Sequence, residues 1–283
     1  MKKFLLIMLL SCALCSVFAQ NVYVRASGDD NNDGLSEERA VKSFDTAVTK
    51  AYTLSRKIVV IGTLNLQSEG YGGILNKWSY GALFRIADIE SELIITGKPN
   101  AEGLERAVIA NSGSDAAVIF IENSIIRFEH IEISGGNGDY GFGIEIVDNA
   151  RITLGQGAVV KDNELSGVII SNGTCIIDGG EIRGNQNSGV IVYERSSLIL
   201  RSGSIRNNIS SGSGGGVFIA ERGSFTMTGG IISGNSAAMF GGGVLVRPGG
   251  RFDQSGGTIS GNTASQGANP NIYRSQGSLG SNL

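Results

Sequence analysis

A short phrase recurs through the second half of this chain and constrains its fold more than any other feature. Its clearest form is Gly-Gly-x-Ile-x-Gly-Asn, as at Gly229–Asn235 and Gly256–Asn262. Six copies, some of them looser, end at Asn137, Asn163, Asn185, Asn208, Asn235 and Asn262, with a mean interval of 25 residues. A period of this size is typical of a solenoid, in which each unit buries its apolar face on its neighbours.

Each late unit contains three strand-like pieces. The first of them is an apolar triplet, such as Val190–Val192, Val217–Ile219 and Val244–Val246. Because side chains alternate across a strand, the outer residues of each triplet share one face. If that face points inward, equivalent residues of successive units form continuous apolar files. The sequence therefore predicts an all-β fold, a parallel β-helix built from a single chain over residues 57–270.

The ends of the chain differ from the repeat. Residues 1–19 have the basic start, apolar run and small-residue cleavage site of a signal peptide, which predicts an exported protein. A membrane anchor and a lipoprotein with its lipid on Cys12 are the alternatives. Residues 20–56 predict a strand, a polar turn and one capping helix that starts after Ser43, with Phe44, Ala47, Val48, Ala51 and Tyr52 on one face. Residues 271–283 are expected to form a C-terminal tail.

Charge and cysteine content narrow the class of partner. The net charge is −3, and it becomes −5 when Lys2 and Lys3 leave with the signal peptide. No cluster of Lys or Arg is present to follow a phosphate backbone, so we expect no nucleic-acid partner. No apolar run is long enough for a spanning helix, so we do not expect an integral membrane protein. Cys175 is the one cysteine beyond the signal peptide, which leaves no internal disulfide.

The combination of these features resembles a known group of proteins. The opening Tyr23-Val24, Asp33-Gly34-Leu35-Ser36 and Lys42-Ser43-Phe44, followed by Gly/Ile/Asn coils, resembles secreted bacterial right-handed β-helix proteins of the pectate-lyase-like fold. The Gly-Gly-Gly-Val and Ile-x-Gly-Asn phrases are similar to repeats of polymorphic outer-membrane-protein passengers. The resemblance implies a right-handed helix, but it does not imply one activity, because this fold carries lyases, hydrolases, adhesins and inert scaffolds.

Two polar patterns are candidate sites with a structural alternative. The recurring Asn163, Asn185, Asn208, Asn235 and Asn262 either line a sugar-binding groove or form a structural ladder at tight turns, and the ladder is favoured. Asp29, Asn31 and Asp33 alternate like the start of a calcium loop, but Ala40 stands where such a loop needs its final Glu. A plain Asx-rich turn is the favoured alternative, and calcium is the only cofactor that the sequence suggests.

Two apolar patterns are candidate contact surfaces. The middle residues of four successive triplets, Ile169, Ile191, Phe218 and Leu245, are expected to face outward as a stripe. Such a stripe either binds a partner or is covered by a loop or by the tail. Trp78 and Tyr80 add aromatic side chains in a less regular segment, where they either stack on sugars or pack internally.

No catalytic set stands out. Glu181, Arg183 and Arg206 are near one another, but a solvated charged face is the favoured interpretation. The family's catalytic motifs do not appear, so its catalytic residues are not carried over. We therefore expect an exported, non-catalytic surface or periplasmic binding protein, adhesin-like, whose partner is a polysaccharide or another surface protein. The alternative is a polysaccharide lyase or glycoside hydrolase with an unrecognised site on the outer face of the helix.

Overall fold

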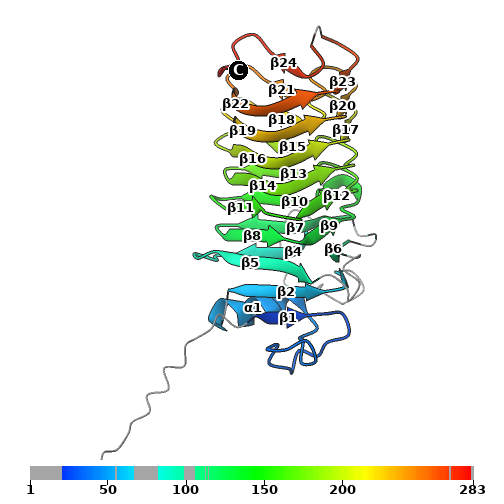
Figure 1. Ribbon diagram of the computed structural model, residues 1–283, viewed down its shortest axis with the longest axis vertical. Coiled ribbons are helices and arrows are strands. Elements are labelled where there is room, and N and C mark those ends of the chain that lie inside the picture. The colour runs from blue at the N-terminus through cyan, green and yellow to red at the C-terminus, as the bar shows by residue number, and fades with distance from the viewer. Residues whose placement is uncertain are drawn as a thin grey trace, which may run out of the picture.

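The computed structural model describes residues 21–54, 56–66, 82–98, 106–111, 113, 115–267 and 269–281. In this part of the chain the strands stack as coils in a column, with one α-helix at its N-terminal end (Figure 1). Named strands pair only in parallel, which confirms the predicted all-β parallel β-helix.

The strands lie in three sheets. The 13-stranded sheet contains β1 (Val22–Val24), β2 (Lys57–Ile61), β3 (Thr63–Asn65), β5 (Leu93–Lys98), β6 (Ala107–Ala110), β8 (Ile125–Glu129), β9 (Ile131–Ser134), β11 (Arg151–Leu154), β12 (Val159–Lys161), β14 (Thr174–Arg183), β16 (Ser197–Arg206), β19 (Ser224–Ser233) and β22 (Arg251–Ser260). The eight-stranded sheet contains β4 (Ala82–Ala87), β7 (Ala117–Glu122), β10 (Ile144–Val147), β13 (Val168–Ser171), β15 (Val190–Val192), β18 (Val217–Ile219), β21 (Val244–Val246) and β24 (Ile272–Arg274). The three-stranded sheet contains β17 (Ile209–Ser210), β20 (Ser236–Ala237) and β23 (Thr263–Ala264).

The core consists of the predicted vertical files. Val190, Val217 and Val244 are direct register partners in three successive coils, and all three are fully buried. The next strands of these coils, β19 and β22, are aligned in the same way: Phe225 is the register partner of Phe252, and their rings stack with centroids 4.8 Å apart. Each coil therefore adds one apolar layer to a continuous interior, as a solenoid requires.

The later coils differ from the expected three separate pieces. Their second and third pieces merge into single ten-residue strands, β14, β16, β19 and β22, that bend at a Gly-Gly pair or, in β16, at Ser202-Gly203. At this bend Gly203 has a φ of +93°, and a Cβ on it would come within 2.1 Å of the Gly180 carbonyl oxygen. A residue without a side chain is needed there, because the backbones of adjacent coils approach so closely.

The repeated asparagines form a continuous hydrogen-bonded ladder inside the column. Each Nδ2 donates to the Oδ1 of the asparagine one coil later, at 2.8 Å from Asn163 to Asn185 and 2.9 Å from Asn235 to Asn262. The backbone N–H of each donates to the same Oδ1, as from Asn185 to Asn208 at 3.1 Å. Asn163, Asn185, Asn208 and Asn235 are fully buried, so the ladder satisfies amides that would otherwise be costly to bury.

The ladder reaches beyond the residues that the repeat identifies. Asn262 donates to Oδ1 of Asn271, only nine residues later, because the last coil returns to the column by a short connection. The adjacent β24 pairs with β21, so parallel pairing continues past residue 270, where the sequence suggested a tail. At the other end, Gly136 takes the ladder position, and Asn137 lies one residue beyond it.

The helix α1 (Phe44–Leu54) closes the N-terminal end of the column. The Ser43 Oγ accepts a hydrogen bond from the Thr46 N–H at 3.1 Å, as expected of an N-cap. Phe44, Ala47 and Ala51 are fully buried, and the Phe44 ring meets Phe84 edge to face. Tyr52 departs from the predicted apolar face, because it is 46% exposed and lies under the Arg56 guanidinium.

The ladder gives a testable stability prediction. Asn208→Ala removes the hydrogen-bond partner of the buried Ile182 carbonyl and of the side-chain amides of Asn185 and Asn235. We therefore expect the free energy of unfolding to fall by about 3 kcal/mol or more. Asn207→Gly is the matched control, because the adjacent Asn207 is exposed with a φ of +55° and the equivalent Gly184 and Gly234 already occupy that turn. Urea unfolding measures both. Equal effects of the two substitutions would contradict the ladder's role.

Candidate functional site

The polar turn near the N-terminus uses its side chains locally. The Asp29 Oδ1 accepts hydrogen bonds from the backbone N–H and the side-chain amide of Asn31, both at 2.9 Å. Asp33 accepts from the Leu35 N–H and pairs with Arg39 at 2.9 Å. Asp29 and Asp33 thus form Asx-type turns, and Asn31 donates to the first of them, as in the Asx-rich turn that the sequence left open.

Asp30, between them, holds the start of α1. Its Oδ1 accepts hydrogen bonds from the Lys42 N–H at 3.0 Å and the Ser43 N–H at 2.7 Å. Burial raises the pKa of Asp30, but the hydrogen bonds from Ser43 and Lys42 outweigh that effect and lower it. Across the described ranges, no three His, Cys, Asp or Glu side chains gather where they could hold a metal ion.

The expected exposed apolar stripe is largely covered. Ile169 and Leu245 are only 8% and 3% exposed, while Ile191 and Phe218 are half-buried. The chain entering β18 and β21 folds back over Phe218 and Leu245. Gly214, for example, lies so close to Phe218 that an added Cβ would come within 2.9 Å of the Phe218 Cβ. This corrects the exposure predicted for the stripe. Trp78 and Tyr80 lie outside the described residues.

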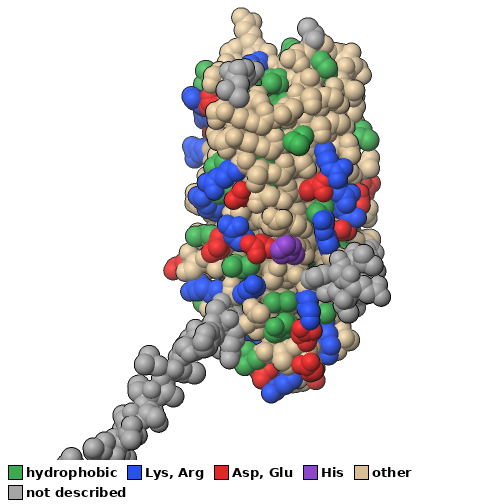
Figure 2. All heavy atoms as spheres, viewed as in Figure 1, with side chains coloured by type: hydrophobic (Ala, Val, Ile, Leu, Met, Phe, Trp, Pro, Cys, Tyr) green, Lys and Arg blue, Asp and Glu red, His purple; other side chains and the backbone are tan. Residues whose placement is uncertain are grey.

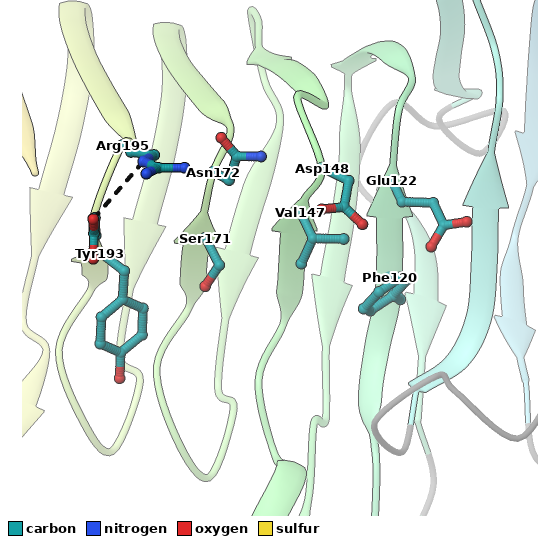
Figure 3. A pocket seen from close by; sticks show the side chains of 9 residues that line it. Phe120, Glu122, Val147, Asp148, Ser171, Asn172, Tyr193 and Arg195 are labelled. Atoms are coloured by element: carbon teal, nitrogen blue, oxygen red, sulfur yellow. Dashed lines mark ion pairs between the residues drawn. The ribbon is translucent and has the colours of Figure 1, made fainter.

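A groove of about 740 Å³ crosses four successive coils on the outer side of the eight-stranded sheet (Figure 3). Strands β7, β10, β13 and β15, or the turns that follow them, each supply two or three of its lining residues. The lining consists of Phe120, Glu122, Val147, Asp148, Ser171, Asn172, Tyr193, Glu194 and Arg195. Register pairing explains their assembly, because Val147 is the direct partner of both Glu122 and Ser171.

The groove mixes aromatic, amide, hydroxyl and charged groups. Tyr193 is 40% exposed at one end of it, and Phe120 is buried at the other. Glu122 forms an ion pair with Arg85. Glu194 accepts from the Arg222 Nη1 at 2.7 Å and pairs with the Arg195 Nε at 3.8 Å. In the described part of the chain, the Asp148 carboxylate has neither an ion pair nor a hydrogen bond to a side chain, and it is exposed.

Glu145 lies beside this groove in an apolar setting. Its register partners on the neighbouring coils are Phe120 and Ile169, and Val147 follows it on the same strand. The Glu145 Oε2 is buried and has no hydrogen-bond partner among the residues that the structure describes. Burial raises the pKa of Glu145 to about 7, so the carboxyl carries a proton over much of the range below neutral pH.

The other residues that drew attention in the sequence are held structurally. Glu181 pairs with Arg206 and, at 3.3 Å, with Arg183, on a different sheet from the groove. Cys175 is fully buried in the core, and burial raises the pKa of its thiol. Figure 2 shows acidic and basic side chains interspersed on the face in view, without a continuous basic track among the described residues.

The groove was not predictable from the repeat pattern of the sequence. Its residues lie at strand ends and in the first turn positions after them, which carry no repeated letter from coil to coil. A usable signal was present: the polar pairs Asp148-Asn149 and Glu194-Arg195 follow first strands that lie two coils apart, and stacking brings them to equivalent positions.

No protein-family model and no curated protein matches this chain. Among solved structures, the chain is similar to the crystal structure of a GH136 lacto-N-biosidase from Eubacterium ramulus, with a TM-score of 0.38 and 9% identity over 94% of this chain and 68% of that one. No helix among the described residues is long and apolar enough to cross a membrane.

The position of Glu145 predicts a pH-dependent stability. Between its ordinary pKa of 4.5 and the folded value of about 7, the folded protein keeps a proton that the unfolded chain releases, so this group lowers the free energy of unfolding as pH rises through that interval. Glu145→Gln removes the effect. We expect the variant to gain up to about 3 kcal/mol relative to wild type between pH 4.5 and 8.

Urea unfolding at several pH values measures this gain, with Glu221→Gln as the control, since the Glu221 side chain is 73% exposed. A constant difference between Glu145→Gln and wild type across this pH range would contradict the buried, neutral carboxyl.

Proposed function

We propose that this chain is an exported bacterial binding protein that holds a glycan in the groove across β7, β10, β13 and β15, at the cell surface or in the periplasm. One observation carries the proposal. The exposed Tyr193 lines the same groove as Asn172, Ser171 and Asp148. The side chains of these three residues form no hydrogen bond or ion pair with another described side chain, so their polar groups are available to a ligand.

Each of these groups has a use in binding sugars. The face of an aromatic ring offers an apolar platform, while its hydroxyl remains available for a hydrogen bond. Carboxylate, amide and hydroxyl groups accept or donate hydrogen bonds to sugar hydroxyls, and a few such groups in a groove fix a ligand's orientation. Because equivalent strands are about 4.8 Å apart, four coils present a lining about 14 Å long, which suits an oligosaccharide better than a single sugar.

Export is part of the proposal and rests on the signal-like residues 1–19. A fold whose strands pair only with neighbouring coils makes a stiff platform, on which lining side chains keep fixed spacings. Rigid sites lose less conformational entropy on binding, which supports recognition without a closing lid.

Glycoside hydrolysis is the second candidate, and Glu145 is the observation that favours it. A carboxyl that remains protonated near neutral pH can act as a general acid, and an apolar environment is the usual way to obtain one. Such an enzyme also needs a second carboxylate on the same face. Asp148 follows Glu145 by three residues and lines the groove.

A glycan array followed by calorimetry tests the first candidate. Tyr193→Ala is expected to weaken binding of the bound glycan about tenfold, because it removes the stacking platform. Tyr140→Ala is the control, since Tyr140 is similarly exposed, at 42%, but does not line the groove.

The same glycans are assayed for release of reducing ends. If the wild-type protein releases reducing ends and Glu145→Gln abolishes that release, the function is hydrolysis and not binding alone. If Tyr193→Ala leaves binding unchanged, the ligand binds elsewhere, and the assignment of the groove as the glycan site is wrong.

A further inference from the structure

The charges around the groove restrict the class of glycan that it can accept. Among the described residues, three carboxylates line it, those of Glu122, Asp148 and Glu194, against one guanidinium from Arg195. The lining alone is therefore negative, which disfavours an anionic ligand through like-charge repulsion.

The cations near the groove already have partners. Arg85 pairs with Glu122, and Arg222 donates to Glu194 at 2.7 Å. Arg195, the single cation of the lining, pairs with the same Glu194 carboxylate, as the dashed line in Figure 3 marks. A uronate carboxylate entering the groove would have to compete with these pairs for its countercharge.

The group that remains is an acceptor. Asp148 comes from the second of the four coils, directly after β10, and its exposed carboxylate is not engaged by another described side chain. An ionised carboxylate only accepts hydrogen bonds, and those that it receives from hydroxyl groups are stronger than neutral ones. The groove is therefore complementary to a ligand that donates hydroxyl protons and carries no negative charge.

We propose that the groove selects uncharged, hydroxyl-rich glycans over uronate polymers, and that Asp148 is the residue that sets this selectivity. The inference rests on the proposed glycan-binding function and specifies its ligand class.

Three matched pairs of hexasaccharides test the proposal. They are β-1,4-glucan and β-1,4-glucuronan, β-1,4-mannan and β-1,4-mannuronan, and methyl-esterified and free α-1,4-galacturonan. Each pair keeps one backbone and differs in the charge at C6. In calorimetry at low salt, we expect a neutral member to bind at least tenfold more tightly than its charged partner, with the difference shrinking as salt rises.

Asp148→Asn is expected to weaken binding of the neutral hexasaccharides. It should also reduce the ratio of neutral to charged affinities about fivefold or more, because the amide no longer repels a carboxylate. Asp178→Asn, which changes a carboxylate on β14 outside the groove, should leave the discrimination unchanged.

Two failures are distinguishable. If the charged hexasaccharides bind as tightly as the neutral ones, and Tyr193→Ala abolishes that binding, the selectivity is overturned while the groove remains a glycan site. If none of the six binds and the glycan array shows no binding either, the proposed function fails, and the selectivity fails with it.

Discussion

Backbone hydrogen bonds between equivalent strands of successive coils hold every other feature of this protein in place. Because the pairing is parallel and in register, one residue per coil recurs at the same position, and like side chains meet like. Apolar residues such as Val190 and Val217 then form a continuous core, and buried asparagines such as Asn185 and Asn208 satisfy one another. Outside this register, each of those amides would be an unpaired polar group in an apolar interior.

The groove is a consequence of the same constraint. No single coil contains it, since its lining is drawn from four coils and is assembled by stacking alone. The register also accounts for Glu145, which takes a place in the outward file that Ile169 and Phe120 occupy in the adjacent coils. A carboxyl confined there loses hydration without gaining a partner, and its pKa rises. The site and its one perturbed acid thus have a common structural origin, which connects the architecture to the proposed function.

Periodic features were predictable from the sequence, and features that depend on the paths of individual loops were not. The 25-residue interval and the apolar triplets predicted the coils and the inward files, and the Ser43 N-cap with its helically spaced apolar residues predicted the helix, because each follows from local pattern. The covering of Leu245 did not follow, since it depends on how the preceding segment folds back over the strand. Asn271 escaped detection for a related reason: the last connection is short and breaks the period. The groove residues have no repeated identity, so only the register, once known, brings Asp148 and Tyr193 to one surface.

The central claim is that successive coils lie directly in register, and a paired-cysteine experiment tests it most directly. In a Cys175→Ala background, Ile199→Cys with Thr226→Cys joins two direct register partners, whose Cα atoms in parallel strands are about 4.8 Å apart and within reach of a disulfide. Ile199→Cys with Thr228→Cys is displaced by two residues, to a separation of about 8 Å. The account predicts that mild oxidation cross-links the first pair and leaves the second reduced. Cross-linking of the displaced pair in preference to the aligned one would contradict it.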